Sequence, residues 1–195
     1  MHIVHINFSI TMGGIDTMLV DILNEHVKKV KTTLIIINDL VDSEVLLPLD
    51  KKIKVIKIKR KLGSRNPFIY LKLNYFIYKI KPTIIHCHNS KLVKLILIKE
   101  IPIVLTVHAM KYCSKNYHLY DKIFAISLAV KRDIQKNGNF PVKLVHNGVK
   151  TSDIISPKRG FFSLPMRIVV VGRLDCDTKG QDILIKAIKQ IDLKQ

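Results

Sequence analysis

Residues 1–27 read MHIVHINFSITMGGIDTMLVDILNEHV, and this stretch decides the fold. Its continuously apolar start, residues 2–7, predicts a buried strand. After a Gly-Gly pair, apolar residues recur at helical spacing and predict a helix with one apolar stripe. The stripe consists of Ile15, Met18, Leu19, Ile22, Leu23 and Val27. The segment therefore predicts a strand, a loop and a helix, which together form the repeating unit of an α/β fold.

Similar apolar, β-branched runs recur along the chain and are separated by amphipathic stretches. We expect strands at 33–38, 53–58, 83–87, 102–106, 122–127 and 142–146. Most of these runs are continuously apolar, which is typical of strands covered on both faces. The pattern predicts an α/β fold with a Rossmann-like, mostly parallel sheet and helices on both of its faces. Residues 51–61, KKIKVIKIKRK, are the exception, because their alternating lysines predict an edge strand.

Further helices are expected between the strands, at 66–80, 90–99, 128–137 and 180–190. For the first of these, we expect Asn66 as the N-cap, Pro67 as the first helical residue and Pro82 as the stop.

A change in composition predicts two domains. Polar and turn-forming residues at 151–165 interrupt the apolar rhythm and predict a linker after a first domain of residues 1–150. Residues 166–195 then restart a strand, a loop and a helix, as if a second α/β domain were beginning. One strand and one helix cannot bury their own apolar faces, so we expect this part to be an incomplete domain.

Composition and charge limit the classes of protein to consider. Apolar residues make up 48% of the 195, and no run reaches the roughly 20 residues of a membrane-spanning helix. The N-terminus has no secretory signal, so we expect a cytoplasmic protein. The formal charge of +18 predicts an anionic partner. Because no aromatic residues interleave the basic runs, we disfavour nucleic acid against an anionic membrane surface or a phosphorylated substrate.

The Gly13-Gly14 pair is the first candidate site, because glycines let the backbone approach a ligand and a helix start attracts anions. A plain tight turn is the alternative. A complete GxGxxG and a Walker A lysine loop are both absent from the sequence.

Histidines at the ends of two predicted strands form the second candidate. His86, His88 and His108 lie where parallel strands end, and ligands bind at that edge of open α/β sheets. Imidazoles there can hydrogen-bond a sugar hydroxyl or a phosphate, although a purely structural role is the alternative. We expect His86 and His88 to point to opposite faces of their strand, and we therefore expect no metal site.

Two further loops complete the candidates. Asn147 and Gly148 form an Asn-Gly turn before the linker. After the linker, Arg173 and Lys179 lie in one loop just before a predicted helix. Two cations near a helix N-terminus suit a diphosphate, which Arg binds bidentately and Lys binds as a point charge.

In this order, these motifs resemble the retaining GT-B glycosyltransferases (glycosyltransferase group 1, family 4-like). That family includes many bacterial transferases of lipopolysaccharide, capsule and glycolipid assembly. The matching segments are Gly13-Gly14, Pro82 to His88, Thr106 to His108, Asp121 to Ser127, Asn147 to Val149, Gly172 to Leu174 and Lys179-Gly180.

The resemblance implies a hexosyltransferase that uses a nucleotide sugar as co-substrate and needs no metal or other cofactor. It implies that the first domain binds a glycan or lipid-linked acceptor on the side of His86, His88 and Asn147. His108 would touch the transferred sugar as the catalytic histidine. The donor phosphates would lie against Gly13 and Gly14 and be stabilised by Arg173 and Lys179.

The sequence departs from the family in one important respect. The family's paired glutamates, seven residues apart in the second domain, have no counterpart here. We therefore expect a truncated transferase with little activity alone, or one completed by a second chain. A non-catalytic basic module on anionic membrane or phosphorylated glycan is the main alternative, and a plain Rossmann-type nucleotide-binding protein is the third.

Overall fold

The computed structural model describes residues 1–64, 66–111, 114–148, 168–172 and 174–190. The chain divides into two compact units, Met1–Thr151 and Ser152–Gln195, and each is described by itself.

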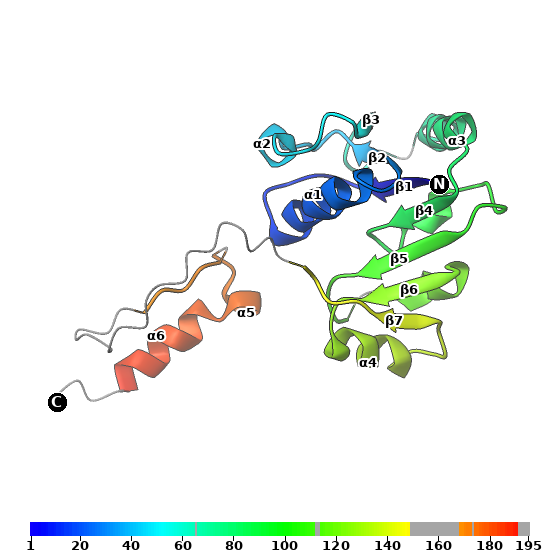
Figure 1. Cartoon of the computed structure of the whole chain (residues 1–195). Helices are drawn as coiled ribbons and strands as arrows, with labels where there is room; N and C mark the ends of the chain where they lie inside the picture. The colour runs from blue at the N-terminus through cyan, green and yellow to red at the C-terminus, as the bar shows by residue number, and fades with distance from the viewer. Residues whose placement is uncertain (65, 112–113, 149–167, 173, 191–195) are drawn as a thin grey trace. The chain divides into compact units, whose positions relative to one another are not determined.

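Within the described residues, the first unit contains one sheet of seven parallel strands (Figure 1). The strands are β1 His2–Asn7, β2 Lys31–Asn38, β3 Lys54–Arg60, β4 Ile84–Cys87, β5 Ile103–Val107, β6 Lys122–Ala125 and β7 Val142–Leu144. Their order is β3-β2-β1-β4-β5-β6-β7. The chain builds the sheet outward from β1 in one direction and then from β4 in the other. The carboxyl ends of β1 and β4 thus form a topological switch point, where doubly wound sheets bind ligands.

Helices and 3-10 turns connect these strands. In the first unit they are α1 Gly14–Val27, α2 Ser43–Leu46, α3 Phe68–Ile80, the 3-10 helices η1 Leu92–Leu95 and η2 Ser114–Leu119, and α4 Leu128–Lys136. In the second unit they are α5 Cys176–Lys179 and α6 Gln181–Gln190. No helix in the described ranges is both long and apolar enough to cross a bilayer.

The sheet is covered on both faces, as the continuously apolar strands predicted. On one face, Leu19 and Leu23 of α1 pack against Leu34 and Ile36 of β2. On the other face, α3, α4 and both 3-10 helices enclose a larger apolar cluster. Its fully buried members include Val4, Ile6, Ile35, Ile37, Leu73, Ile77, Ile85, Cys87 and Ile123.

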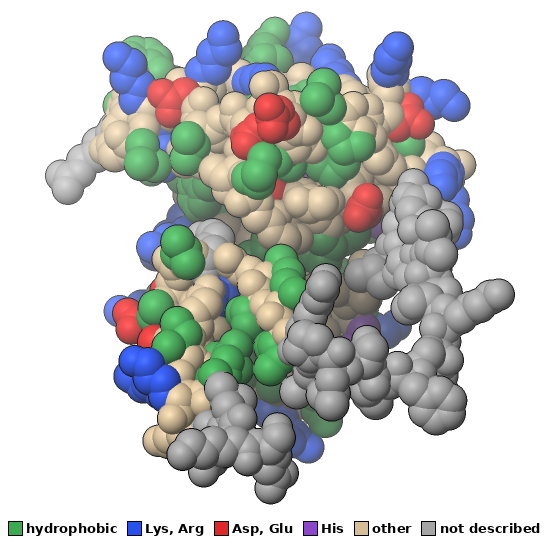
Figure 2. Space-filling view, turned by 90° about the vertical axis from the view of Figure 1, so that its left-hand side faces the viewer, with side chains coloured by type: hydrophobic (Ala, Val, Ile, Leu, Met, Phe, Trp, Pro, Cys, Tyr) green, Lys and Arg blue, Asp and Glu red, His purple; other side chains and the backbone are tan. Residues whose placement is uncertain are grey.

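The prediction of an edge strand is confirmed, because β3 lies at one end of the sheet. Its exposed Lys54, Lys57 and Lys59 alternate with the buried Ile56 and Ile58. More widely, Lys and Arg side chains lie on several parts of the face in Figure 2, with fewer acidic side chains among them.

The prediction of a helix at 90–99 is wrong, because only one short 3-10 helix, η1, forms there. Asn74 of α3 explains where the helix stops. Its amide donates to the Leu95 carbonyl and accepts from the Leu97 N–H, both at 2.8 Å. These bonds occupy backbone groups that a longer helix would pair internally.

Two smaller expectations also need correction. The helix predicted at 66–80 begins at Phe68, with Pro67 as its N-cap residue. The strand expected at the start of the second unit does not form within the described residues 168–172. A parallel strand needs a paired neighbour, and here Val171 remains 92% exposed.

Candidate functional site

A buried carboxylate shapes the loop between β1 and α1. Asp16 accepts hydrogen bonds from the Thr11 N–H at 2.8 Å, the Thr11 hydroxyl at 3.0 Å and the Asn7 amide at 3.0 Å. These bonds tie the end of β1 to the first turn of α1. The loop that carries the two glycines is therefore held in one conformation.

Gly13 and Gly14 form the start of α1. Gly13 is the N-cap residue in extended conformation, and its carbonyl accepts from the Asp16 and Thr17 N–H groups. A Cβ added at either glycine would meet nothing within 4 Å. The space beside both glycines is open, which leaves room for an anion to approach the first N–H groups of α1.

His108 and His88 follow the ends of β5 and β4, as the sequence predicted. His88 Nδ1 lies 3.3 Å from His108 Nε2, a hydrogen-bonding distance. The other nitrogen of His108, Nδ1, is buried and has no hydrogen-bond partner in the described part of the chain. A buried polar atom without a partner is uncommon, and its hydrogen-bonding capacity is left for a ligand group or an ordered water.

The sequence did not single out two further histidines that belong to this cluster. His5 of β1 is fully buried, and its Nδ1 lies 3.1 Å from His88 Nε2. On its other side, His5 Nε2 lies 3.0 Å from Nδ1 of His26, which is near the end of α1. Only the fold brings these rings together, because their residues are 21 and 83 positions apart along the chain.

His86 and His88 lie on the same face of β4, so the expectation that they diverge is wrong. Residues two apart on a strand share a face, and the two rings stack with their centroids 4.5 Å apart. His86 Nε2 is also within 2.8 Å of the Thr106 hydroxyl.

Because these histidines share a face, they could hold a metal ion. One nitrogen from each of His5, His86 and His88 lies within 4.8 Å of the other two. Three imidazoles suit a borderline divalent ion such as zinc. A metal would, however, have to replace the hydrogen bond between His5 and His88.

Burial keeps these imidazoles neutral. It lowers the pKa of His5 and His88 well below the ordinary 6.5, and neighbouring histidines lower both further. Burial brings the pKa of His86 to about 3 and that of His108 to about 4. At neutral pH each ring therefore has one N–H to donate and one lone pair to accept, which suits a sugar hydroxyl.

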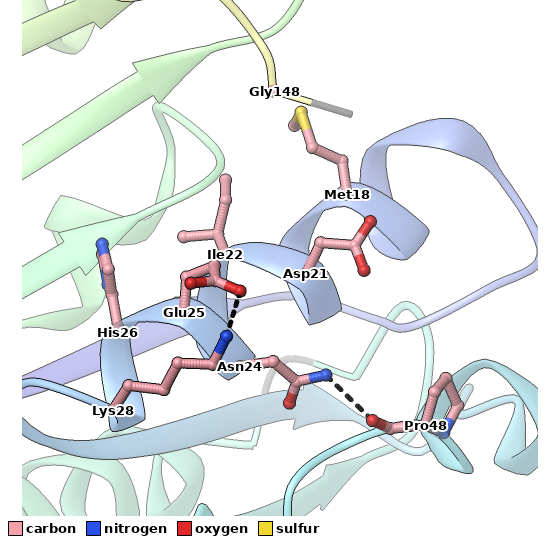
Figure 3. Close-up of a pocket in the computed structure, with 9 residues that line it drawn as sticks. All are labelled: Met18, Asp21, Ile22, Asn24, Glu25, His26, Lys28, Pro48 and Gly148. Carbon is pink, nitrogen blue, oxygen red and sulfur yellow. Dashed lines mark hydrogen bonds and ion pairs between the residues drawn. The ribbon is translucent and has the colours of Figure 1, made fainter. Parts of the chain in front are cut away.

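Two cavities adjoin the histidine cluster. His86, Asn147 and Gly148 line a cavity of about 390 Å³ over β4, β5 and β6, together with His26 and the apolar Val104 and Phe124. A second cavity of about 560 Å³ lies along α1 (Figure 3). Met18 points towards Gly148 in this view, and His26 lies further along the helix. His26 thus lines both cavities.

The second unit carries the remaining candidates. Lys179 is exposed at the end of α5, and its side chain lies 3.5 Å from the position that a Cβ on Gly172 would take. Arg173 lies outside the described residues. The prediction that Arg173 and Lys179 bind a diphosphate therefore stays a prediction.

Comparison with known protein families identifies the family of the first unit. Residues 12–153, well over half of the chain, match the model of Glycosyltransferase Family 4. The chain belongs to Glycosyltransferase Family 4. The matched span contains Gly13, Gly14 and all the clustered histidines except His5. No curated protein sequence matches the chain significantly.

Solved structures share the fold of this Family 4 chain. HepE of Anabaena, in complex with UDP and glucose, matches 75% of the chain at 17% identity with a TM-score of 0.58. The lipopolysaccharide outer core galactosyltransferase WaaB matches 80% at 18% identity with a TM-score of 0.61. The UDP-GlcNAc 2-epimerase of Methanocaldococcus jannaschii matches 75% at 14% identity with a TM-score of 0.59.

These matches support the predicted GT-B fold. The Family 4 chain covers 44% of HepE, 48% of WaaB and 46% of the epimerase, so it spans about half the length of each. The presence of an epimerase among them means that the fold alone does not fix the reaction. The family is one of glycosyltransferases, and the match to it does not favour the non-catalytic basic module.

Proposed function

We propose that this Family 4 chain forms the acceptor-side part of a retaining, nucleotide-sugar-dependent hexosyltransferase. Its acceptor would be a glycan or lipid-linked sugar in the synthesis of cell-surface polysaccharide or glycolipid. One observation carries the proposal. The family match covers a unit in which Gly14, His88 and His108 all follow the strand ends at or beside the switch point.

Each candidate residue has a role in this proposal. Gly13 and Gly14 leave room for a phosphate or sugar at the start of α1. His108 contacts the transferred sugar through Nδ1, which has no partner among the described residues. His86 and Asn147 line the acceptor side through the cavity of about 390 Å³. Arg173 and Lys179 stabilise charge on the leaving diphosphate, which is worth a few kcal/mol per well-placed donor.

We further propose that the 195-residue chain transfers sugar slowly or not at all when alone. The solved structures of the same fold are about twice as long, and paired glutamates like those of the family are missing from this sequence. A longer polypeptide or a second chain would supply the rest of the donor pocket.

Titration with nucleotide sugars tests this proposal. The purified chain is mixed with a panel of UDP- and GDP-sugars, while histidine ring resonances and sugar transfer are both followed. We expect weak binding that shifts His108 and leaves the exposed His118 unchanged, with no turnover. Micromolar binding with turnover would show that the chain is complete in function. If the His108 resonances do not shift at saturation, the proposed position of the sugar site is wrong.

The outer side of α3 supports a peripheral location on an anionic membrane face inside the cell. Four apolar or aromatic side chains recur at helical spacing and are 54–70% exposed: Phe68, Leu71, Tyr75 and Tyr78. Lys72, Lys79 and Lys81 lie beside them and are also exposed. Aromatic side chains flanked by lysines suit the headgroup region of anionic lipids.

Sedimentation with anionic vesicles tests this location. We expect the chain to sediment at low salt and to be released at high salt, because exposed charges are then screened. A variant with Phe68→Ser and Tyr75→Ser should bind several-fold more weakly. A matched variant with Leu47→Ser and Leu128→Ser, two exposed residues outside α3, should bind like the parent. Equal binding by both variants would contradict docking through α3.

A further inference from the structure

Four imidazoles form one continuous hydrogen-bonded chain beneath α1. The contacts run from His26 Nδ1 to His5 Nε2 at 3.0 Å, from His5 Nδ1 to His88 Nε2 at 3.1 Å, and from His88 Nδ1 to His108 Nε2 at 3.3 Å. His5 and His88 each use both ring nitrogens. We call these four residues the imidazole chain.

Neutral rings restrict how protons can be arranged in the imidazole chain. Each neutral ring carries one N–H and one lone pair, and each contact needs one of each. If His5 or His88 changed tautomer alone, two N–H groups would face each other at one of its contacts and two lone pairs at the other. Only two arrangements satisfy all three contacts: every ring protonated on Nε2, or every ring protonated on Nδ1.

The state of the free nitrogen of His108 therefore depends on His26, at the far end of the chain. When all rings carry the proton on Nε2, His108 Nδ1 presents a lone pair. When all carry it on Nδ1, the same atom presents an N–H. The hydrogen bond made by one ring nitrogen of a histidine commonly fixes which of the two nitrogens carries the proton.

We propose that His26, His5 and His88 are positioning residues that set the tautomer of His108. They thereby decide whether its Nδ1 accepts from or donates to a hydroxyl of the transferred sugar. The inference rests on the proposed function only for the identity of that ligand. The Nε2–H form is the more stable one for a free histidine side chain, so the resting chain offers an acceptor at His108.

Nitrogen-15 spectra of the histidine rings test the proposal without any sugar. The protonated nitrogen of a neutral ring resonates far from the unprotonated one, so each tautomer can be read directly. In the unsubstituted protein we expect His5, His26, His88 and His108 all to carry the proton on Nε2. A mixed set of tautomers among the four would overturn the proposal, even if every variant failed to fold.

Substitution of the outer ring provides the sharper test. His26→Lys places a group that can only donate next to His5, so His5, His88 and His108 should all change to the Nδ1–H form. His26→Gln can still accept from His5 and should leave the three tautomers unchanged. Ile22→Lys adds the same charge one turn away on the same cavity walls and is the matched control.

Two results would overturn the proposal. The first is a change at His5 in His26→Lys with no change at His108, which would mean that the rings are not coupled. The second is stoichiometric zinc bound to His5, His86 and His88 in the purified protein, since metal ligation would replace the contact between His5 and His88. Failure of sugar transfer would count against the proposed function and would not alter the tautomers.

Discussion

The two faces of the sheet use the same strands in opposite ways. On the face under α3 and α4, Ile6, Ile85 and Cys87 are fully buried in an apolar cluster. On the face under α1, the neighbouring positions His5, His86 and His88 carry imidazoles. Alternation along each strand separates the two environments completely. The first face is apolar along β1 and β4, while the second carries paired imidazoles there, beside the smaller apolar cluster between α1 and β2.

Lowering the pH should have the largest effect on the free energy of unfolding. It should act through the buried histidines on the face of the sheet under α1. The pKa of His86 is about 3 in the folded chain against an ordinary 6.5, so the unfolded chain binds more protons between these values. The free energy of unfolding should therefore fall as the pH drops from about 6.5 towards 3. His5 and His88 act in the same direction.

Urea unfolding of the chain at several pH values checks this prediction. The midpoint should decrease steadily below about pH 6.5. Replacing the exposed His118 with Gln should leave the pH dependence unchanged. A midpoint that stays constant down to about pH 4 would mean that the buried rings are already protonated or accessible to water.

Truncation on the apolar face should have the next largest effect. Ile85→Ala removes a fully buried side chain from the larger cluster and should cost about 2–5 kcal/mol of unfolding free energy. Val104→Ala on the neighbouring strand should cost much less, because Val104 is partly exposed and lines a cavity. Equilibrium urea unfolding measures both. Equal losses would show that the two faces are packed alike.

Breaking the imidazole chain should lower the free energy of unfolding by less than truncating a side chain of the apolar core. His5→Phe keeps an aromatic ring but leaves His26 Nδ1 and His88 Nε2 without the partner that His5 provides. We expect a loss of about 1–3 kcal/mol from these unpaired groups. His118→Phe, at an exposed position of η2, is the control and should change stability by less than about 0.5 kcal/mol. If His5→Phe left the free energy of unfolding unchanged, water would already form hydrogen bonds with the neighbouring rings.

The smallest stability change is expected where the histidine face meets the candidate phosphate site. Gly14→Ala should alter the unfolding free energy by no more than about 0.5 kcal/mol, because a methyl group there meets no neighbour. The same change should weaken any binding of nucleotide sugar by at least severalfold, since it occupies the open space. Calorimetric titration and urea unfolding together separate the two effects. Loss of stability without loss of binding would mean that the glycines are needed for the turn and not for ligand binding.

The strands could be predicted because their signal is local. Runs such as residues 33–38 are apolar and β-branched from end to end, and the alternating lysines placed β3 at the edge. The failed helix at 90–99 shows the limit of that approach. Its backbone is held by Asn74, a residue from another helix that no local pattern connects with it.

The candidate site was predictable only in part. His86, His88 and His108 stood out because they follow predicted strand ends. His5 lies inside an apolar run and His26 lies within a helix, so neither position carried a signal. Their contribution depends on the pairing of β1 with β4 and on the packing of α1, which are long-range features of the fold.

The two edge strands of the sheet influence whether copies of the protein aggregate. An open strand edge can template a strand from another molecule and so begin aggregation. At β3, two approaching copies would bring rows of lysines against each other. At the opposite end, β7 has only three residues and offers little to pair with. Repulsion at one edge and brevity at the other should keep concentrated solutions of the chain free of sheet-to-sheet assembly.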